Sequence, residues 1–382
     1  MDLATFRRDY WEQRPLLVRR EAPSYYADLL TLDDVDKVLS LAGVHLDGIR
    51  VVVNGKETPV SQLATSARNG LTNALEALFE RYRSGSTIVL NSLDQRWEPL
   101  RRLAGSLGAE MSARLQMNVY LTPAGAQGFA PHYDTHDVFV AQVHGTKHWR
   151  LASQPHALPL RGQPYDKSQP EPDPEQAFDL RSGDVLYLPR GTVHWATAQD
   201  RASVHITIGV HPVLWSDVFT DAMRQLFTEE VRFRQGLPIG FAHDVHLRHQ
   251  VEGTFVELLD VLRTRLSPSA AVAENVKRTA SIGSPTLRGH LTDLDRLATL
   301  WIDTRVRRRP GLRWNLTVTD DAVELDFHNK SVRFPVPVAD EVRHATGTAD
   351  VFTANDVPGD LDEPGRLVLI RTLLREGFLT FV

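Results

Sequence analysis

The sequence predicts an α+β protein in which an antiparallel jelly roll is followed by a helical module and a small mixed module. Three observations support this fold class. Short strand-like segments separated by turns fill the chain from about residue 115 to residue 211. Beyond Pro212 the apolar residues recur at helical spacing, and after Arg309-Pro310 strand patterns return together with two further helices.

The region before the jelly roll is expected to be mainly helical. Residues 2–12 have the pattern of a short helix, and Thr31 followed by acidic residues marks the start of a second one. Apolar residues recur at helical spacing between 71 and 82, which predicts a helix that faces the core. Residues 86–90 then resemble a strand and 97–107 a helix, so this region leads into the first jelly-roll strand.

The jelly roll is expected to contain short antiparallel strands whose side chains point into its mouth. Val143 to Lys147 reads as a hairpin turn between two of them. Residues 153–179 are rich in proline and polar residues and predict a long loop near the mouth, where substrate selection usually occurs. The expected strands are 115–121, 137–143, 147–152, 184–188 and 202–210.

The part after the jelly roll predicts two more domains. The helical module has two apolar faces, formed by Phe219, Met223, Leu226 and Phe227 and by Leu258, Leu259, Leu262 and Leu266. The last module has the order of a winged-helix-like unit, with strands at 313–318, 322–327 and 331–335, helices at 338–346 and 362–376, and a strand at 379–382. The expected domains are therefore 1–213, 214–305 and 306–382.

Composition excludes several classes of function. The chain has 382 residues, a formal net charge of −5 and no cysteine, which rules out disulfides, thiolate zinc sites and cysteine nucleophiles. No stretch approaches the ~20 apolar residues of a membrane span, so we expect a cytoplasmic protein. Residues 311–382 carry seven Lys and Arg against twelve Asp and Glu, which argues against DNA binding by this module. The basic run 305–309 is interpreted as a solvated linker that RNA could touch.

Two motifs together predict a metal site. His132 and Asp134 are two residues apart in a strand-like run, so both side chains should leave the same face. The pattern G-D-x-L-Y-x-P-x-G-x-x-H supplies a third ligand, His194, at the end of a strand and a tight turn. Two histidines and one carboxylate form the facial triad that leaves adjacent positions open on iron(II). An H-x-D pair alone would be weak evidence, because such residues often lie on strand surfaces.

The residues around these motifs resemble a known family. Residues 115–211 resemble the JmjC-type, cupin-fold 2-oxoglutarate oxygenases, and the resemblance lies in the stretches GFAPHYDTHDVFVAQVHGTKHWRL and GDVLYLPRGTVHWA. The whole chain resembles the ribosomal-oxygenase branch of that family. The resemblance implies Fe(II), 2-oxoglutarate as cosubstrate, dioxygen, and hydroxylation of a side chain, His or Arg, in a ribosomal protein. It assigns the metal to His132, Asp134 and His194, and it implies a homodimer formed through the helical module.

The resemblance also implies residues that bind the cosubstrate. Lys147 stands where the family has a cation for the distal carboxylate of 2-oxoglutarate, although most lysines point into solvent. Asn118 and Thr207 match polar positions that line the cosubstrate pocket, and each could instead be a satisfied polar group in the core. His205 lies on the same strand face as Thr207, where it would either support the site or serve the structure alone.

Two other functions remain open at this stage. A hydroxylase of a small metabolite or of a peptide natural product would use the same iron chemistry, with different residues around the entrance to the site. A non-enzymatic protein would instead act through the winged-helix-like module. Turnover of 2-oxoglutarate separates the enzymes from the binding protein. Four further histidines near the triad are expected to lie on the surface rather than to form a second metal site: His136, His144, His148 and His156.

Overall fold

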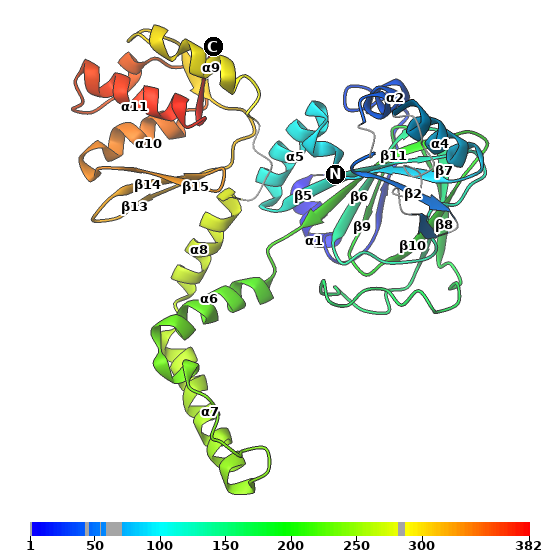
Figure 1. Ribbon diagram of the computed structural model, residues 1–382, viewed down its shortest axis with the longest axis horizontal. Coiled ribbons are helices and arrows are strands. Elements are labelled where there is room, and N and C mark those ends of the chain that lie inside the picture. The colour runs from blue at the N-terminus through cyan, green and yellow to red at the C-terminus, as the bar shows by residue number, and fades with distance from the viewer. Residues whose placement is uncertain (1, 43–45, 54, 59–70, 282–286) are drawn as a thin grey trace. The chain divides into compact units, whose positions relative to one another are not determined.

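The computed structural model describes residues 2–42, 46–53, 55–58, 71–281 and 287–382. The chain divides into two compact units, Met1–His211 and Pro212–Val382 (Figure 1). Among the described residues, none of the helices combines the length and the apolar character that crossing a bilayer requires. The expected cytoplasmic location stays a prediction.

Two antiparallel sheets build the first unit. The larger sheet has eight strands in the order β1-β9-β6-β11-β5-β4-β2-β3, and the smaller has three in the order β10-β7-β8. Their bounds are β1 Leu16–Val18, β2 Ile49–Val53, β3 Lys56–Thr58, β4 Thr87–Leu90, β5 Arg114–Thr122, β6 Asp137–His144, β7 Thr146–Ala152, β8 Gln176–Arg181, β9 Val185–Leu188, β10 Val193–Ala198 and β11 Ser203–His211.

Apolar side chains from both sheets form one core between them. Val138 and Leu186 come from the larger sheet, and Trp149, Leu180 and Ala196 come from the smaller. This arrangement is that of two sheets packed face to face, in which inward-facing side chains alternate with outward-facing ones. The expected cupin-type α+β fold is therefore confirmed.

Helices cover the other face of the larger sheet. Leu39, Leu78 and Leu100 are buried in one cluster with Met117 and Val119 of β5. Thr31 caps the first of these helices through a capping box with Asp34. The helices of this unit are α1 Leu3–Asp9, α2 Leu32–Ser40, α4 Leu71–Arg83 and α5 Glu98–Met111, with a 3₁₀ turn η1 Leu93–Gln95.

The structure corrects the prediction for the segment that carries the metal motif. His132 and Asp134 do not lie in a strand, because only an isolated bridge pairs His132 with His194 before β6 begins at Asp137. His194 is the second residue of β10 rather than the end of a strand. The hairpin between β6 and β7 is present at the expected place. Gly145 has φ +71° there, and an added Cβ would lie 2.1 Å from the Ala202 carbonyl oxygen, so this turn requires glycine.

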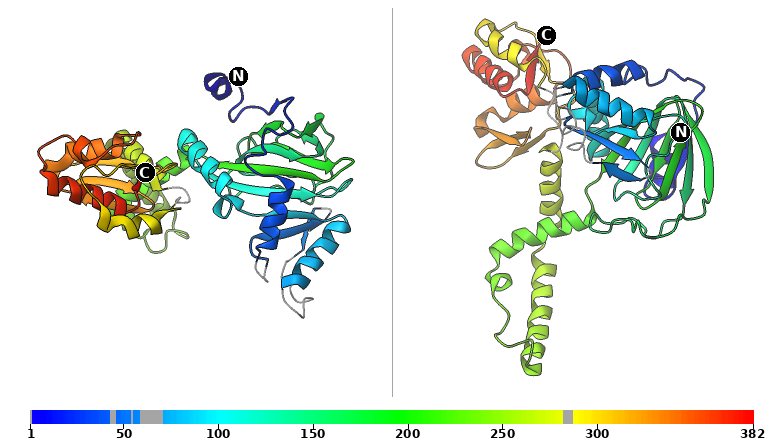
Figure 2. Two further views of the ribbon diagram at one scale, coloured as in Figure 1. Left: turned by 90° about the horizontal axis from the view of Figure 1, so that it is seen from above. Right: turned by 45° about the vertical axis from the view of Figure 1, so that its right-hand side comes forward.

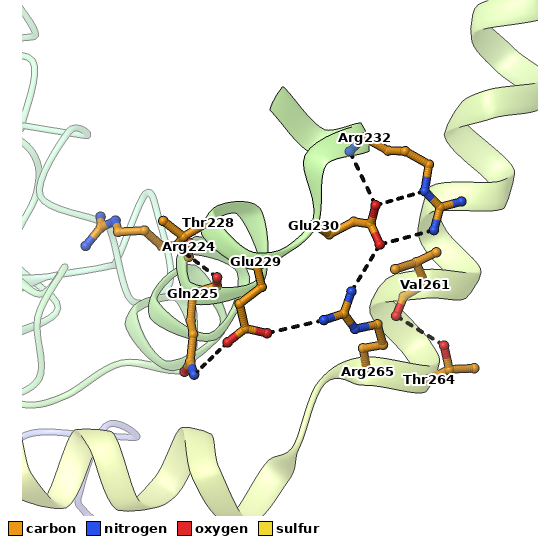
Figure 3. A network of polar contacts seen from close by, with 9 residues as sticks. All are labelled: Arg224, Gln225, Thr228, Glu229, Glu230, Arg232, Val261, Thr264 and Arg265. Atoms are coloured by element: carbon orange, nitrogen blue, oxygen red, sulfur yellow. Dashed lines mark hydrogen bonds and ion pairs between the residues drawn. The ribbon is translucent and has the colours of Figure 1, made fainter. Parts of the chain in front are cut away.

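Three helices begin the second unit: α6 Trp215–Glu229, α7 Val245–Arg265 and α8 Pro268–Ser281 (Figures 1 and 2). None of the 21 residues of α7 is buried within this chain. Ion pairs join α7 to the end of α6, because Arg265 contacts both Glu229 and Glu230 at 3.3 and 3.0 Å (Figure 3). Arg232 also forms an ion pair with Glu230, so this carboxylate binds both Arg232 and Arg265. Polar contacts thus hold α6 and α7 together where apolar packing is sparse.

The rest of the second unit has its own apolar core. Phe327, Val342, Ile370 and Phe378 are fully buried in it, and Leu300 joins them from the segment before the strands. The elements are α9 His290–Arg296, η3 Leu297–Thr299, β12 Val306–Arg308, β13 Asn315–Val318, β14 Val323–Phe327, β15 Lys330–Phe334, η4 Val336–Val338, α10 Ala339–Gly347, η5 Ala354–Asp356, α11 Glu363–Arg375 and β16 Leu379–Phe381.

The basic run at 305–309 is not a solvated linker, so that interpretation was wrong. Residues 306–308 form β12, which pairs with β16. Arg309 is only 3% exposed and donates to the Asp293 carboxylate at 2.6 Å. A run of like charges usually predicts solvent exposure. Here the buried arginine is matched by a carboxylate from α9, which sequence spacing does not reveal.

Candidate metal and cosubstrate site

Backbone hydrogen bonds bring the three candidate ligands together. The amide of His194 donates to the His132 carbonyl at 2.8 Å, and the amide of His132 donates to the His194 carbonyl at 3.3 Å. The amide of Gly191 donates to the Asp134 carbonyl at 3.0 Å. The loop before β6 and the start of β10 are thereby fixed side by side, and their side chains converge.

The side chains form a group with the dimensions of a metal site. One ligand atom from each of His132, Asp134 and His194 lies within 4.8 Å of the others, and no other such group of three occurs among the residues that the structure describes. His132 Nδ1 lies 2.8 Å from the Ala130 carbonyl and His194 Nδ1 lies 2.9 Å from the Thr192 carbonyl. These contacts place the ring proton on Nδ1 of each histidine. Each Nε2 therefore keeps a lone pair that can bind a metal.

The electrostatics suit metal binding as well. Burial, together with charge on the neighbouring His132, lowers the pKa of His194 to about 4. Burial alone would raise the pKa of Asp134, but charge on His132 and the other nearby histidines holds it below its usual value. His194 is therefore neutral and Asp134 ionised near neutral pH, as a nitrogen and an oxygen ligand need to be. The residues present fit a divalent metal with open positions.

A cavity of about 430 Å³ opens beside these residues. Its wall contains all three candidate ligands and all four residues expected to contact the cosubstrate. Trp149 and Tyr120 add aromatic surface, and Arg50, Arg161 and Lys167 add positive charge. Asp134 is the one carboxylate among the described residues of the wall. The size and mixed lining are typical of a small-molecule site with a few convergent polar groups.

Lys147 points into the structure rather than into solvent. It is 4% exposed, and its Nζ donates to Thr122 Oγ1 at 3.1 Å. Among the described residues no carboxylate forms an ion pair with it, and burial lowers its pKa to about 7. A buried ammonium without a counter-ion is costly unless a ligand supplies the charge. The environment of Lys147 therefore fits a bound carboxylate.

The other expected cosubstrate residues also line the cavity. Asn118 and Thr207 are opposite each other in the register of β5 and β11, and Asn118 Oδ1 accepts from the Ser92 amide at 2.9 Å. His205 stacks on Tyr120 with ring centroids 4.8 Å apart and almost parallel planes. His205 thus contributes a packed ring beside the cavity, and its burial lowers its pKa well below the usual value.

Sequence reasoning missed the residues that shape the mouth. Tyr133, between the first two candidate ligands, donates from its hydroxyl to the Gln163 carbonyl at 2.8 Å and packs edge-on against Tyr165. This contact fixes part of the loop that was expected near the mouth, and Arg161 and Lys167 of that loop line the cavity. The sequence signal was only the length and composition of the loop, which cannot tell which of its residues face inward.

The neighbouring histidines have separate roles. His136 lines the cavity and stacks on His211 with ring centroids 4.6 Å apart, so it is not a plain surface residue. His148 pairs with Asp179 at 2.8 Å, and His156 packs against Tyr133. In the described part of the chain they form no second cluster of three metal-binding side chains.

Residues 93–218 match the family model of the JmjC domain. This segment therefore resembles a JmjC domain, and this is the class of protein to which the chain is similar. Within that class it is similar to the ribosomal oxygenases: it is 32% identical to Ribosomal oxygenase 1 of Homo sapiens over 322 residues, covering 78% of this chain and 48% of that protein. The chain thus spans about half the length of this relative.

Two further similarities bear on fold and function. The chain is 29% identical over 252 residues to the Drosophila mojavensis protein named bifunctional lysine-specific demethylase and histidyl-hydroxylase NO66, covering 62% of this chain and 27% of that one. The structure of YcfD, a ribosomal oxygenase from Escherichia coli in complex with cobalt and 2-oxoglutarate, matches with a TM-score of 0.53 at 15% identity, covering 100% of this chain and 98% of that one. The latter likeness concerns the fold alone.

Proposed function

We propose that this protein is an Fe(II)- and 2-oxoglutarate-dependent hydroxylase that modifies a side chain of a ribosomal protein. The observation that carries the proposal is one cavity that joins a two-histidine, one-carboxylate group to a buried lysine that has no counter-ion among the described residues. The relatives support it through their names, and YcfD supports it through the metal and cosubstrate in its complex.

Each part of the cavity has a role in this proposal. His132, Asp134 and His194 would hold iron(II), and Lys147 would bind the distal carboxylate of 2-oxoglutarate. Asn118, Thr207 and His205 would line the space between them. When bound, iron(II) with 2-oxoglutarate and dioxygen supplies the oxidation of a C–H bond to an alcohol, with succinate and carbon dioxide as the other products. The protein's own contribution is to orient these groups and to limit water around them.

The charge of the cavity favours histidine over arginine as the hydroxylated residue. Arg50, Arg161 and Lys167 line the wall, and Asp134, the one carboxylate among the described lining residues, would be occupied by the metal. A cationic target would meet like charges without a carboxylate to receive it, which is unfavourable in a partly desolvated site. A neutral imidazole would avoid this repulsion and could stack on Tyr165 or Tyr133 at the mouth. The histidyl-hydroxylase named among the relatives agrees with this choice.

Mass spectrometry of ribosomal-protein peptides tests the proposal. Purified protein with Fe(II), 2-oxoglutarate and dioxygen should add the mass of one oxygen atom to a histidine-containing peptide. A matched peptide with alanine in place of that histidine should gain no oxygen, and an arginine version should react poorly. Hydroxylation of the arginine peptide at an equal rate would contradict the assignment of the target residue.

Other results would point to the alternative functions. Succinate formation without hydroxylation of any ribosomal protein would favour a small metabolite or a peptide natural product as substrate. A protein that binds neither metal nor 2-oxoglutarate would instead be a binding protein that acts through its C-terminal module. Either result would contradict the proposal that a ribosomal protein is the substrate.

We also propose three domains: a catalytic domain at 1–213, a helical domain from 214, and a winged-helix-like C-terminal domain. The three antiparallel strands β13, β14 and β15 together with α10 and α11 support the last of these. Leu297 and Leu300 pack with the C-terminal core, and Asp293 of α9 binds Arg309. For this reason we begin the C-terminal domain near residue 287 rather than at 306.

The helical domain is expected to form a homodimer. Large apolar side chains stay exposed along its helices, among them Phe219 at 56%, Phe255 at 61% and Val256 at 60%. A helix without buried residues gains little from folding back on its own chain, whereas a second copy can cover its apolar side chains across a twofold axis. Light scattering at micromolar concentration should therefore give about twice 42.9 kDa.

A pair of variants sharpens this prediction. Phe255→Glu should shift the mass to that of a monomer, because it places a charge in the expected apolar interface. Val368→Glu is the matched control, since Val368 is a similarly exposed apolar residue on α11, outside the helical domain, and it should leave the dimer intact. A wild-type protein that is monomeric at this concentration would rule out the dimer.

A further inference from the structure

A buried ionic network lies directly behind the metal-binding loop. Asp137 is fully buried and Arg190 is 6% exposed. The Arg190 guanidinium donates to the Asp137 carboxylate at 2.7 Å and to Glu12 at 2.5 Å. The Tyr187 hydroxyl donates to the same Asp137 carboxylate at 3.0 Å. One guanidinium is thus held between two carboxylates from distant parts of the chain.

The network is tied to two of the candidate metal ligands. Asp137 begins β6 three residues after Asp134, and the backbone amide of Arg190 also donates to the Asp137 carboxylate, at 3.3 Å. The next residue, Gly191, donates its amide to the Asp134 carbonyl at 3.0 Å. The same loop continues to His194, whose ring contacts the Thr192 carbonyl. Arg190 therefore fixes the segment that follows Asp134 against the loop that precedes His194.

The N-terminal segment completes this network. Glu12 lies between α1 and β1 in a left-handed conformation with φ +58°. Its amide donates to the Tyr187 hydroxyl at 2.9 Å. The Tyr187 ring packs against Phe6 and Trp11, with centroids 5.1 and 5.9 Å away, and β1 pairs with β9. The N-terminal segment is thus attached to the same loop by aromatic, backbone and ionic contacts.

Stability alone is a poor reason for such a network. Replacing a buried ion pair with apolar residues of similar volume is often neutral or stabilising, because desolvation of the charges offsets their attraction. Directional bonds from a planar guanidinium do, however, fix the geometry of the groups that they join. The network therefore suits a role in positioning.

We propose that Arg190, held between Asp137 and Glu12, is a positioning residue that orients Asp134 and His194 for the metal. The N-terminal segment is then part of the support of the metal centre. This inference rests on the proposed metal site and adds residues that do not touch the metal themselves. Replacing a residue that orients a metal ligand commonly lowers metal affinity by about ten- to a hundredfold.

Cobalt(II) titration of the full-length protein, followed by the visible absorption of the bound ion, tests the inference. Arg190→Met removes the charge but keeps most of the volume, and it should weaken cobalt binding by about ten- to a hundredfold and alter the shape of the absorption band. Arg190→Lys should have a smaller effect, because a lysine keeps the positive charge but replaces the planar guanidinium with a flexible ammonium. Glu12→Gln, at a partly exposed position, should give a smaller but measurable loss.

Asp184 provides a matched control. It is buried, precedes β9 at the end opposite Arg190, and also ties the N-terminal region to the barrel by accepting from the Arg20 amide at 2.8 Å. Its second oxygen accepts from the Arg181 amide at 3.0 Å. Asp184→Asn should therefore lower the melting temperature without changing cobalt affinity or the absorption band. This separates positioning from general stability.

The outcomes decide between the two explanations. Unchanged cobalt affinity in Arg190→Met, or an equal loss in Asp184→Asn, would overturn the inference. If Arg190→Met does not fold, Arg190→Lys and Glu12→Gln carry the same comparison with Asp184→Asn. Cobalt binding that depends on Arg190 in a protein without hydroxylase activity would support the inference while contradicting the proposed function. No cobalt binding by the wild-type protein would overturn both the metal site and the inference.

Discussion

Replacing His132, Asp134 or His194 with alanine is expected to abolish 2-oxoglutarate turnover while the fold is kept. These residues form the one group of three metal-binding side chains in the described part of the chain, so each loss leaves two protein ligands for the ion. The fold should survive, because the core between the sheets is apolar and does not include them. Succinate formation measures turnover, and circular dichroism with thermal melting measures the fold.

A matched variant and metal removal complete this test. His148→Ala removes another histidine of the same barrel, one that pairs with Asp179 and does not line the cavity, and it should keep most of the activity. A chelator should abolish turnover by the wild-type protein, and added Fe(II) should restore it. Full turnover by any one alanine variant would exclude that residue from the metal site.

Two of the jelly-roll strands, β5 and β7, were predictable because side-chain burial alternates along them. β6, β9 and β11 are mostly buried and appear in the sequence as short apolar runs between turns. In β5 intermediate and buried residues alternate over almost the whole strand, which is the pattern that a half-buried strand leaves in the sequence. β8 and β10 were missed for different reasons. β8 follows a proline-rich loop and has few buried residues, and the first residues of β10 complete the metal motif, which indicates a turn rather than a strand.

The site was predictable in its chemistry but not in its geometry. The residue types at His132, Asp134 and His194 indicate a metal, yet the argument from strand periodicity was wrong, since a bridge between loop and strand brings them together. Such a bridge depends on residues about sixty positions apart, and local spacing carries no information on it. The same holds for Glu12 and Arg190, which are 178 positions apart in the sequence and bind each other in the structure.

Replacing Lys147 with alanine is expected to raise the 2-oxoglutarate requirement about ten- to a hundredfold, with little change in metal affinity. A hydrogen bond to a charged group contributes ~1.5–3 kcal/mol, and 1.4 kcal/mol corresponds to about a factor of ten in binding. Lys147 does not belong to the metal group, so cobalt titration should give nearly the wild-type affinity. Lys167→Ala is the matched control, because it removes the same charge from the exposed rim of the same cavity.

The pH dependence of 2-oxoglutarate binding provides a second measurement of the same residue. Because burial lowers the pKa of Lys147 to about 7, the free lysine loses its proton as the pH rises through that value. The cosubstrate carboxylate needs the charged form, so binding should be accompanied by proton uptake, and affinity should fall above about pH 7 by up to about tenfold per pH unit. This decline should disappear in Lys147→Ala and persist in Lys167→Ala. A wild-type affinity that is constant from pH 7 to pH 9, or an unchanged requirement in Lys147→Ala, would show that another group binds the carboxylate.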